Sequence, residues 1–141
     1  MLAAEVERWA SQVGALVAPG GRFYIHDGHP LAWAMDDDVE QRLAWGYFEE
    51  AEPYVWDSDQ TYTDATRPIE HGRTYEWNHS LGEIVNALID HGLTIDRLAE
   101  HDWTVAQIRP WLVEHEPGRW QAKPGSPRLP LSFSLLAHRR P

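Results

Sequence analysis

The sequence predicts an α/β fold in a single domain. A predicted helix leads into a predicted strand twice, over residues 2–26 and again over residues 80–98. A third strand-like segment, residues 131–137, comes near the end of the chain. This order of elements is typical of an α/β sheet. At 141 residues the chain is long enough to bury one core, so residues 1–141 are predicted to form one domain.

The first helix is predicted from apolar residues at spacings of three and four, which share one helical face: Leu2, Val6, Trp9, Val13, Leu16 and Val17. Pro19-Gly20-Gly21 ends this helix. Residues 22–26, RFYIH, are rich in aromatic and β-branched side chains and predict a short strand. His-Asp-Gly-His-Pro then turns that strand into a loop.

Residues 31–73 show no steady apolar period and combine aromatic rings with acids. We predict that they form a lid-like insertion with one short helix and a hairpin. A loop this long inside a compact domain is usually functional or disordered, and its content of rings favours function.

The second helix, residues 80–91, begins with the capping-box pattern Ser80-Leu81-Gly82-Glu83. Gly92 is predicted to end it in the left-handed conformation. Residues 94–98 then predict a strand. A Trp- and Pro-rich excursion, residues 103–130, precedes the last predicted strand.

Charge and composition exclude several classes of partner. Twelve Lys and Arg against 22 Asp and Glu give a formal charge of −10, which argues against nucleic acid or an anionic membrane as partner. No apolar run is long enough to cross a membrane. No signal-peptide pattern follows Met1 and cysteine is absent, which together favour a cytoplasmic location.

The charges and the rings are unevenly spread. Residues 35–66 hold ten acids and one base, whereas residues 117–141 hold five bases and no acid. The simplest interpretation is a solvated acidic flap and a basic tail, and the alternative is electrostatic docking. The eight Trp, five Tyr and three Phe exceed what one small core needs, so some are expected to line a pocket.

Three segments taken in order resemble one known pattern: APGGRFYIHDGHPL (18–31), TYEWNHSLGEIVNALIDHGLTIDRLAEHDW (74–103) and PRLPLSFSLLAHR (127–139). Together they resemble the C-terminal half of a class I S-adenosylmethionine-dependent methyltransferase of the small-molecule type. The resemblance implies a partial Rossmann-like sheet with flanking helices and the long aromatic insertion. In the strand numbering of that family, the resemblance makes residues 22–26 strand five. It makes residues 94–98 and 131–137 strands six and seven, which form a terminal antiparallel hairpin.

The glycine-rich cofactor loop of that family has no counterpart in this sequence, which contains neither G-x-G-x-G nor G-x-G-x-x-G. Glycines in such loops allow close approach of the backbone, and a carboxylate accepts the ribose hydroxyls. S-adenosylmethionine is therefore the cofactor implied for the complete family member, and this chain alone is expected to bind it weakly or not at all. The open edge of the first strand favours a homodimer or a complementing N-terminal half as partner.

His26 and His29 lie where the first strand gives way to a loop, and open α/β sheets place ligands at the carboxyl ends of strands. A neutral imidazole at His29 is a candidate base for the proton of a methyl acceptor, and His26 is a candidate substrate contact. The alternative is histidines that are hydrogen-bonded within a loop. The H-x-x-H spacing also permits a metal, but short matches of this kind arise by chance and no metal site is predicted.

Residues 75–79, Tyr-Glu-Trp-Asn-His, precede the capped helix. The resemblance implies that Tyr75 and Trp77 face the substrate and that His79 lies near it as a second candidate base. The alternative is that Trp77 anchors the core and His79 only flanks the helix.

Five further rings are candidates for an aromatic box over an apolar or cationic small molecule: Trp103, Trp111 and Trp120 of the excursion, with Tyr47 and Phe48 of the insertion. The alternative is that these rings attach the long loops to the sheet. Two functions therefore stay open. One is the substrate-side half of a methyltransferase that works mainly by proximity, and the other is a non-catalytic binding or assembly module with the same pocket.

Overall fold

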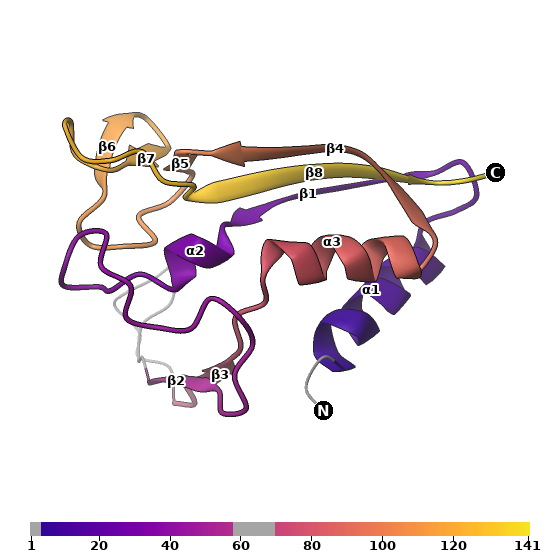
Figure 1. Cartoon of the computed structure of the whole chain (residues 1–141), viewed down its shortest axis with the longest axis horizontal. Helices are drawn as coiled ribbons and strands as arrows, with labels where there is room; N and C mark the ends of the chain where they lie inside the picture. The colour runs from indigo at the N-terminus through magenta and orange to yellow at the C-terminus, as the bar shows by residue number, and fades with distance from the viewer. Residues whose placement is uncertain (1–3, 58–69) are drawn as a thin grey trace.

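The computed structural model describes residues 4–57 and 70–141 of the chain. Two helices, α1 (Ala4–Leu16) and α3 (Leu81–Asp90), lie on the same face of a three-stranded sheet (Figure 1). Both predicted helices are confirmed, although Leu2 lies outside the described residues. None of the described helices has the length and apolar character needed to span a bilayer. The chain is thus a mixed α/β protein.

The sheet consists of β1 (Arg22–Gly28), β8 (Ser132–Arg139) and β4 (Leu93–His101), in that spatial order. β8 lies in the middle and is antiparallel to both neighbours, with Arg22 opposite His138. β1 and β4 consequently run in the same direction, and their carboxyl ends lie at the same end of the sheet. The three predicted strands and the antiparallel pairing of the last two are confirmed, and β1 lies at an edge of the sheet as predicted.

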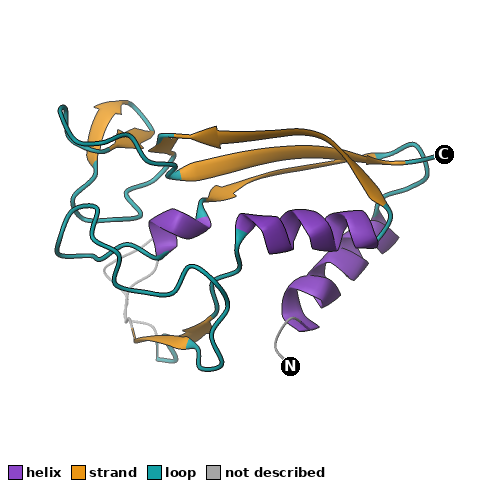
Figure 2. Cartoon of the chain, viewed as in Figure 1, coloured by secondary structure: helices purple, strands orange, loops and turns teal. Residues whose placement is uncertain are grey.

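The main core lies between this sheet and the two helices. Side chains of a strand alternate between faces, so every second residue of β8 points toward the helices. Phe133, Leu135 and Ala137 do so and are at most 2% exposed. They belong to one cluster with Ala10 of α1 and Leu88 of α3, both completely buried. No described helix covers the other face of the sheet (Figure 2).

Local signals at both ends of α3 act as the sequence predicts. The Ser80 hydroxyl accepts a hydrogen bond from the Glu83 backbone N–H at 3.3 Å, and the Glu83 carboxylate accepts one from the Ser80 N–H at 2.7 Å. Gly92 follows the helix with a φ of 88°, which glycine adopts without a steric penalty. The start of β4 is therefore set by the end of α3.

α2 (Pro30–Trp33) begins one residue before the predicted insertion, and an antiparallel hairpin of β2 (Tyr54–Asp57) and β3 (Arg73–Glu76) extends past its predicted end at residue 73. The predicted short helix and hairpin are thus confirmed. Residues 58–69 of the predicted insertion lie outside the described residues.

The excursion forms a small sheet in the order β5-β7-β6, which the sequence did not predict. Its strands are β5 (Trp103–Thr104), β7 (Arg119–Gln121) and β6 (Val113–Glu116). Segments of two to four residues are too short to show an alternating pattern. A second core joins this sheet to the insertion, and its buried members are Ala32, Met35, Trp111, Leu112 and Leu131.

We predict that Ser80→Ala lowers the free energy of unfolding by about 1 kcal/mol, because the first turn of α3 loses a side-chain acceptor. Urea denaturation measures the change. Ser80→Thr keeps a hydroxyl at the cap and is expected to retain most of the stability. Equal stability of Ser80→Ala and the wild type would show that the capping box does not stabilise the helix.

Candidate functional site

A cavity of about 740 Å³ lies between the insertion, the segment before α3 and the excursion. Six Trp and Tyr rings line it, and we call it the aromatic cavity: Trp33, Trp45, Tyr54, Trp56, Tyr75 and Trp77. Its polar lining includes Glu5, Asp37, Glu76, Asn78, His79 and Arg109. A volume of this size with a few converging polar groups is typical of a small-molecule site.

Trp33 places the aromatic cavity beside the carboxyl end of β1. α2 follows β1 after a single residue, His29, so one helical turn carries the chain from the strand to Trp33. The indole ring lies against Gly28, where an added Cβ would be 2.5 Å from Trp33 Nε1. Only glycine at residue 28 leaves room for the ring in this position.

The rings on the insertion side contact one another edge to face. Trp45 lies 5.2 Å from Tyr54 and 6.4 Å from Trp56, measured between ring centres, with interplanar angles of 70° and 63°. Tyr54 and Trp56 are two residues apart on β2 and therefore project from the same face of the hairpin. β2 thus supplies two rings to one wall of the aromatic cavity.

Asn78 connects three parts of the cavity wall. Its side-chain amide donates to the carbonyl of Pro30 at 2.9 Å and to that of Gly46 at 3.0 Å, and the residue is 9% exposed. The Tyr47 hydroxyl accepts a hydrogen bond from the Leu81 N–H at 3.3 Å. These bonds attach the segment before α3 to α2 and to the insertion.

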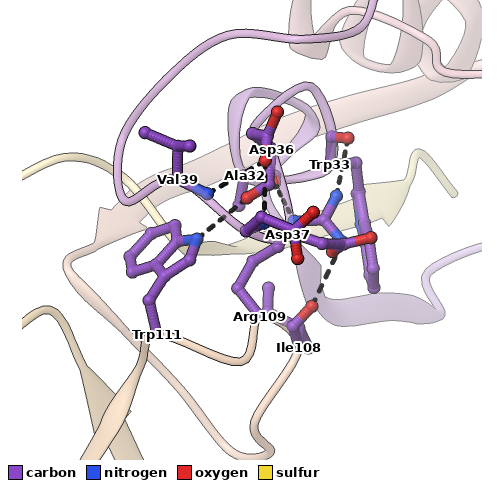
Figure 3. A network of polar contacts seen from close by, with 9 residues as sticks. Ala32, Trp33, Asp36, Asp37, Val39, Ile108, Arg109 and Trp111 are labelled. Carbon is purple, nitrogen blue, oxygen red and sulfur yellow. Dashed lines mark hydrogen bonds and ion pairs between the residues drawn. The ribbon is translucent and has the colours of Figure 1, made fainter.

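Arg109 supports the wall from the side of the excursion (Figure 3). Its guanidinium donates to the carbonyls of Ala32, Trp33 and Ile108 at 2.7–3.2 Å and to the Asp37 carboxylate at 3.0 Å. The residue is only 3% exposed, and burial lowers the pKa of the guanidinium while Asp37 opposes that shift. The guanidinium also lies 5.3 Å from the centre of the Trp33 ring.

Trp77 and His79 border the aromatic cavity and also a second cavity of about 360 Å³. The second cavity extends along α1 to Asp27 at the end of β1. Trp77 Nε1 and His79 Nδ1 are buried and have no hydrogen-bond partner among the described residues. The nearest acid to His79 is Glu49, whose carboxylate lies 4.0 Å from Nδ1. Trp77 and His79 thus border both cavities, while these two nitrogen atoms are themselves enclosed.

His29 is placed differently from its expected role as a base. It is 3% exposed, and its Nδ1 accepts a hydrogen bond from the Leu31 N–H at 3.0 Å. That bond puts the proton of a neutral ring on Nε2, which donates to Glu100 at 2.9 Å. Burial lowers the pKa of His29 and the Glu100 carboxylate opposes the shift. Both ring nitrogens are therefore occupied by contacts within the chain.

His26 lies on the sheet face that carries no described helix. Its ring contacts those of His101 and Trp103, at 5.6 and 5.3 Å between centres, and its Nε2 lies 3.1 Å from the Ser132 hydroxyl. Burial, and to a smaller extent His26, lower the pKa of His101. The structure thus separates His26 and Trp103 from the aromatic cavity, since neither residue lines it.

The five rings expected to form one aromatic box are not brought together. Trp111 is buried in the second core, where Nε1 donates to the carbonyl of Asp36 at 2.9 Å, and Trp120 packs against the same core. Tyr47 and Phe48 contact each other, and Phe48 is 68% exposed. Of the predicted site residues, the structure gathers Tyr75, Trp77 and His79 at the aromatic cavity.

Sequence reasoning missed Trp33, Tyr54, Trp56 and Arg109 as parts of this cavity. The signal available for Tyr54 and Trp56 was their spacing of two within a short aromatic run, which places both rings on one side of a strand. Arg109 offered no such signal, because a single basic residue in a loop is usually solvated.

The described residues do not provide the elements that S-adenosylmethionine requires. Four glycines have positive φ values. Gly20 and Gly92 lie where β1 and β4 begin, at the end of the sheet away from Gly28, and Gly118 and Gly125 lie in the excursion. Within residues 4–57 and 70–141, no glycine-rich loop therefore follows a carboxyl end of the sheet as the cofactor's close backbone approach demands.

Comparison with solved structures relates this fold to S-adenosylmethionine-dependent methyltransferases. A crystal structure from Listeria monocytogenes, described as a candidate enzyme of this class, matches with a TM-score of 0.54 at 14% identity, over 96% of this chain and 55% of that chain. A methyltransferase from Mesorhizobium loti matches with a TM-score of 0.50 at 22% identity, over the same shares. This chain therefore has a methyltransferase-like fold and spans about half the length of each. No family model and no curated protein matches the sequence.

We predict that Arg109→Met lowers the free energy of unfolding by about 3–5 kcal/mol, because it leaves buried carbonyls and Asp37 without their donor. The matched control is Arg128→Met, since Arg128 pairs with Asp102 at 2.6 Å but its side chain is 82% exposed. The control is expected to lose little stability, because solvent screens an exposed ion pair. Similar losses in urea denaturation of both variants would contradict the role assigned to Arg109.

A pH dependence follows from the lowered pKa of His29. The folded state disfavours the protonated form of His29, whose ordinary pKa is 6.5. The free energy of unfolding is therefore independent of this group above that pH and decreases as the pH falls below it. His29→Asn keeps a capping acceptor for the Leu31 N–H and removes the titrating ring. We predict a smaller loss of stability between pH 7.5 and 5 (roughly the titration range of histidine) for the variant, measured by urea denaturation. An equal loss in both proteins would contradict this.

Proposed function

We propose that the chain is the substrate-side part of an S-adenosylmethionine-dependent methyltransferase, and that the aromatic cavity holds a small-molecule methyl acceptor. The observation that carries the proposal is the position of this cavity beside the carboxyl end of β1, in a fold similar to methyltransferases. In the proposed correspondence, β1, β4 and β8 are strands five, six and seven of the Rossmann-like sheet.

The chain's own residues would bind and orient the acceptor. The six rings of the cavity provide apolar contact surface, and Asn78 and Arg109 hold the backbone that carries them in place. Fixing an acceptor in one orientation supplies much of the acceleration of a two-substrate reaction.

His79 is the proposed base of this reaction. Of the two histidines expected in that role, only His79 lines the aromatic cavity, and its Nδ1 has no hydrogen-bond partner among the described residues. A neutral imidazole accepts the proton that a hydroxyl or amine loses as it takes a methyl group. Glu49, 4.0 Å from Nδ1, is positioned to stabilise the resulting imidazolium.

S-adenosylmethionine supplies an electrophilic methyl group in enzymes of this class. Because the described residues do not fit that cofactor, the proposal assigns its binding to a complementing N-terminal half. The alternative function is a non-catalytic binding module. It is favoured by the observation that the described residues build and support the aromatic cavity but form no glycine-rich loop at a carboxyl end of the sheet.

We predict that the 141-residue chain gives no binding heat with S-adenosylmethionine or its demethylated product in calorimetric titration. The physical reason is the lack of a glycine-rich loop among the described residues. Micromolar binding would overturn the assignment of the cofactor to a complementing half.

The acceptor site has a separate test with 4-fluorophenol, a neutral aromatic alcohol, followed by fluorine NMR. We expect line broadening with the wild type and about fivefold weaker binding with Trp45→Leu, because a ring is removed from the cavity wall. The control is Tyr24→Leu, whose ring is 63% exposed and lies outside the cavity lining. Absence of binding, or equal weakening by both variants, would contradict the proposed acceptor site.

A further inference from the structure

The aromatic cavity carries an excess of negative charge. Three acids line it, Glu5, Asp37 and Glu76, and the one base in its lining is Arg109. Arg109 pairs with Asp37 at 3.0 Å and is buried, so the charge of Asp37 is already balanced. Glu5 and Glu76 form no ion pair with a described residue. Among the described residues, Glu5 and Glu76 therefore have no paired base at the wall of a cavity lined by six rings.

The rings of this cavity are not used to build the protein's interior. Neither of the two cores formed by described residues includes any of the six. Trp45, Trp56 and Tyr75 are 43%, 38% and 57% exposed. Clustered aromatic surface that remains accessible around a cavity is typical of a binding site.

The geometry of the rings suits a positive charge. The faces of aromatic rings are electron-rich, and cations bind over them within about 6 Å of the ring centre. Trp45 meets Tyr54 and Trp56 edge to face, an arrangement that does not stack ring on ring. One ring of the cavity already holds a cation, since the Arg109 guanidinium lies 5.3 Å from the centre of Trp33.

We propose that the aromatic cavity selects an organic cation with an apolar body, in which the positive nitrogen of a quaternary ammonium or protonated amine is recognised and a separate hydroxyl or neutral amine accepts the methyl group. The charge is recognised by the open ring faces together with Glu76 and Glu5, and the apolar body fills the remaining volume of about 740 Å³. This inference rests on the proposed function, because it names the substrate class of the same cavity.

A matched pair of probes separates charge from shape. Choline carries a quaternary ammonium, and 3,3-dimethylbutan-1-ol is its neutral isostere. We expect NMR titrations of the full chain to show choline binding at least about tenfold more tightly than the alcohol. Equal affinity, tighter binding of the alcohol, or no binding of choline would overturn the inference.

Charge-removing variants locate the effect. Glu76→Gln keeps the shape of an exposed side chain on β3, and it is expected to weaken choline binding about threefold or more while leaving the alcohol unchanged. Glu116→Gln removes the same charge from β6, outside the cavity lining, and is expected to leave both affinities unchanged. Equal loss of choline affinity in the two variants would overturn the assignment to this cavity. Circular dichroism confirms that each variant is folded.

The outcomes distinguish this inference from the proposed function. If 4-fluorophenol binds in a Trp45-dependent manner but choline does not bind, the cavity remains an acceptor site and its selectivity for cations is overturned. If choline binds while 4-fluorophenol does not, the inference stands and the neutral acceptor site is contradicted.

Discussion

The buried guanidinium of Arg109 is the interaction on which the rest of the site depends. α2 is a helix of four residues, too short to persist through its own hydrogen bonds. The Arg109 guanidinium donates hydrogen bonds to the carbonyls of Ala32 and Trp33 in that helix. It also forms an ion pair with Asp37 in the segment that follows. These contacts join the excursion and the insertion into one wall of the aromatic cavity. They also fix the Trp33 ring against Gly28.

Around Arg109, hydrogen bonds connect the segments that form the aromatic cavity. Asn78 connects α2, the insertion and the approach to α3, and the capping box at Ser80 fixes the first turn of that helix. Each of these groups has specific partners and leaves few alternative arrangements, as buried polar networks do when they are fully satisfied. Hydrogen bonds to the backbone, and not stacking of ring on ring, position the segments that carry the aromatic rings. The rings therefore remain accessible from the cavity.

The frame of the fold could be predicted because its signals are local. The capping box, the left-handed Gly92 and the aromatic strand at residues 22–26 each act within a few residues, and the structure has all three where expected. The cavity could be predicted only in part. Tyr75, Trp77 and His79 stand in one short segment, whereas Trp33 and Arg109 meet across 76 residues of chain, a contact that no spacing reveals. The same limit explains His29, whose partner Glu100 lies 71 residues away.

The order of strands has a consequence for how the protein is made. β8 is the last element in the chain and the middle strand of the main sheet, so β1 and β4 have no partner until residues 132–139 exist. The nascent chain can form α1 and α3 early, but the sheet closes only after residues 132–139 have been synthesised. Contacts between residues as distant as Arg22 and His138 are slow to form and leave apolar surface exposed meanwhile. Until residues 132–139 are added, the growing polypeptide therefore exposes apolar side chains of β1 and β4 that the finished sheet buries, and it is prone to aggregate.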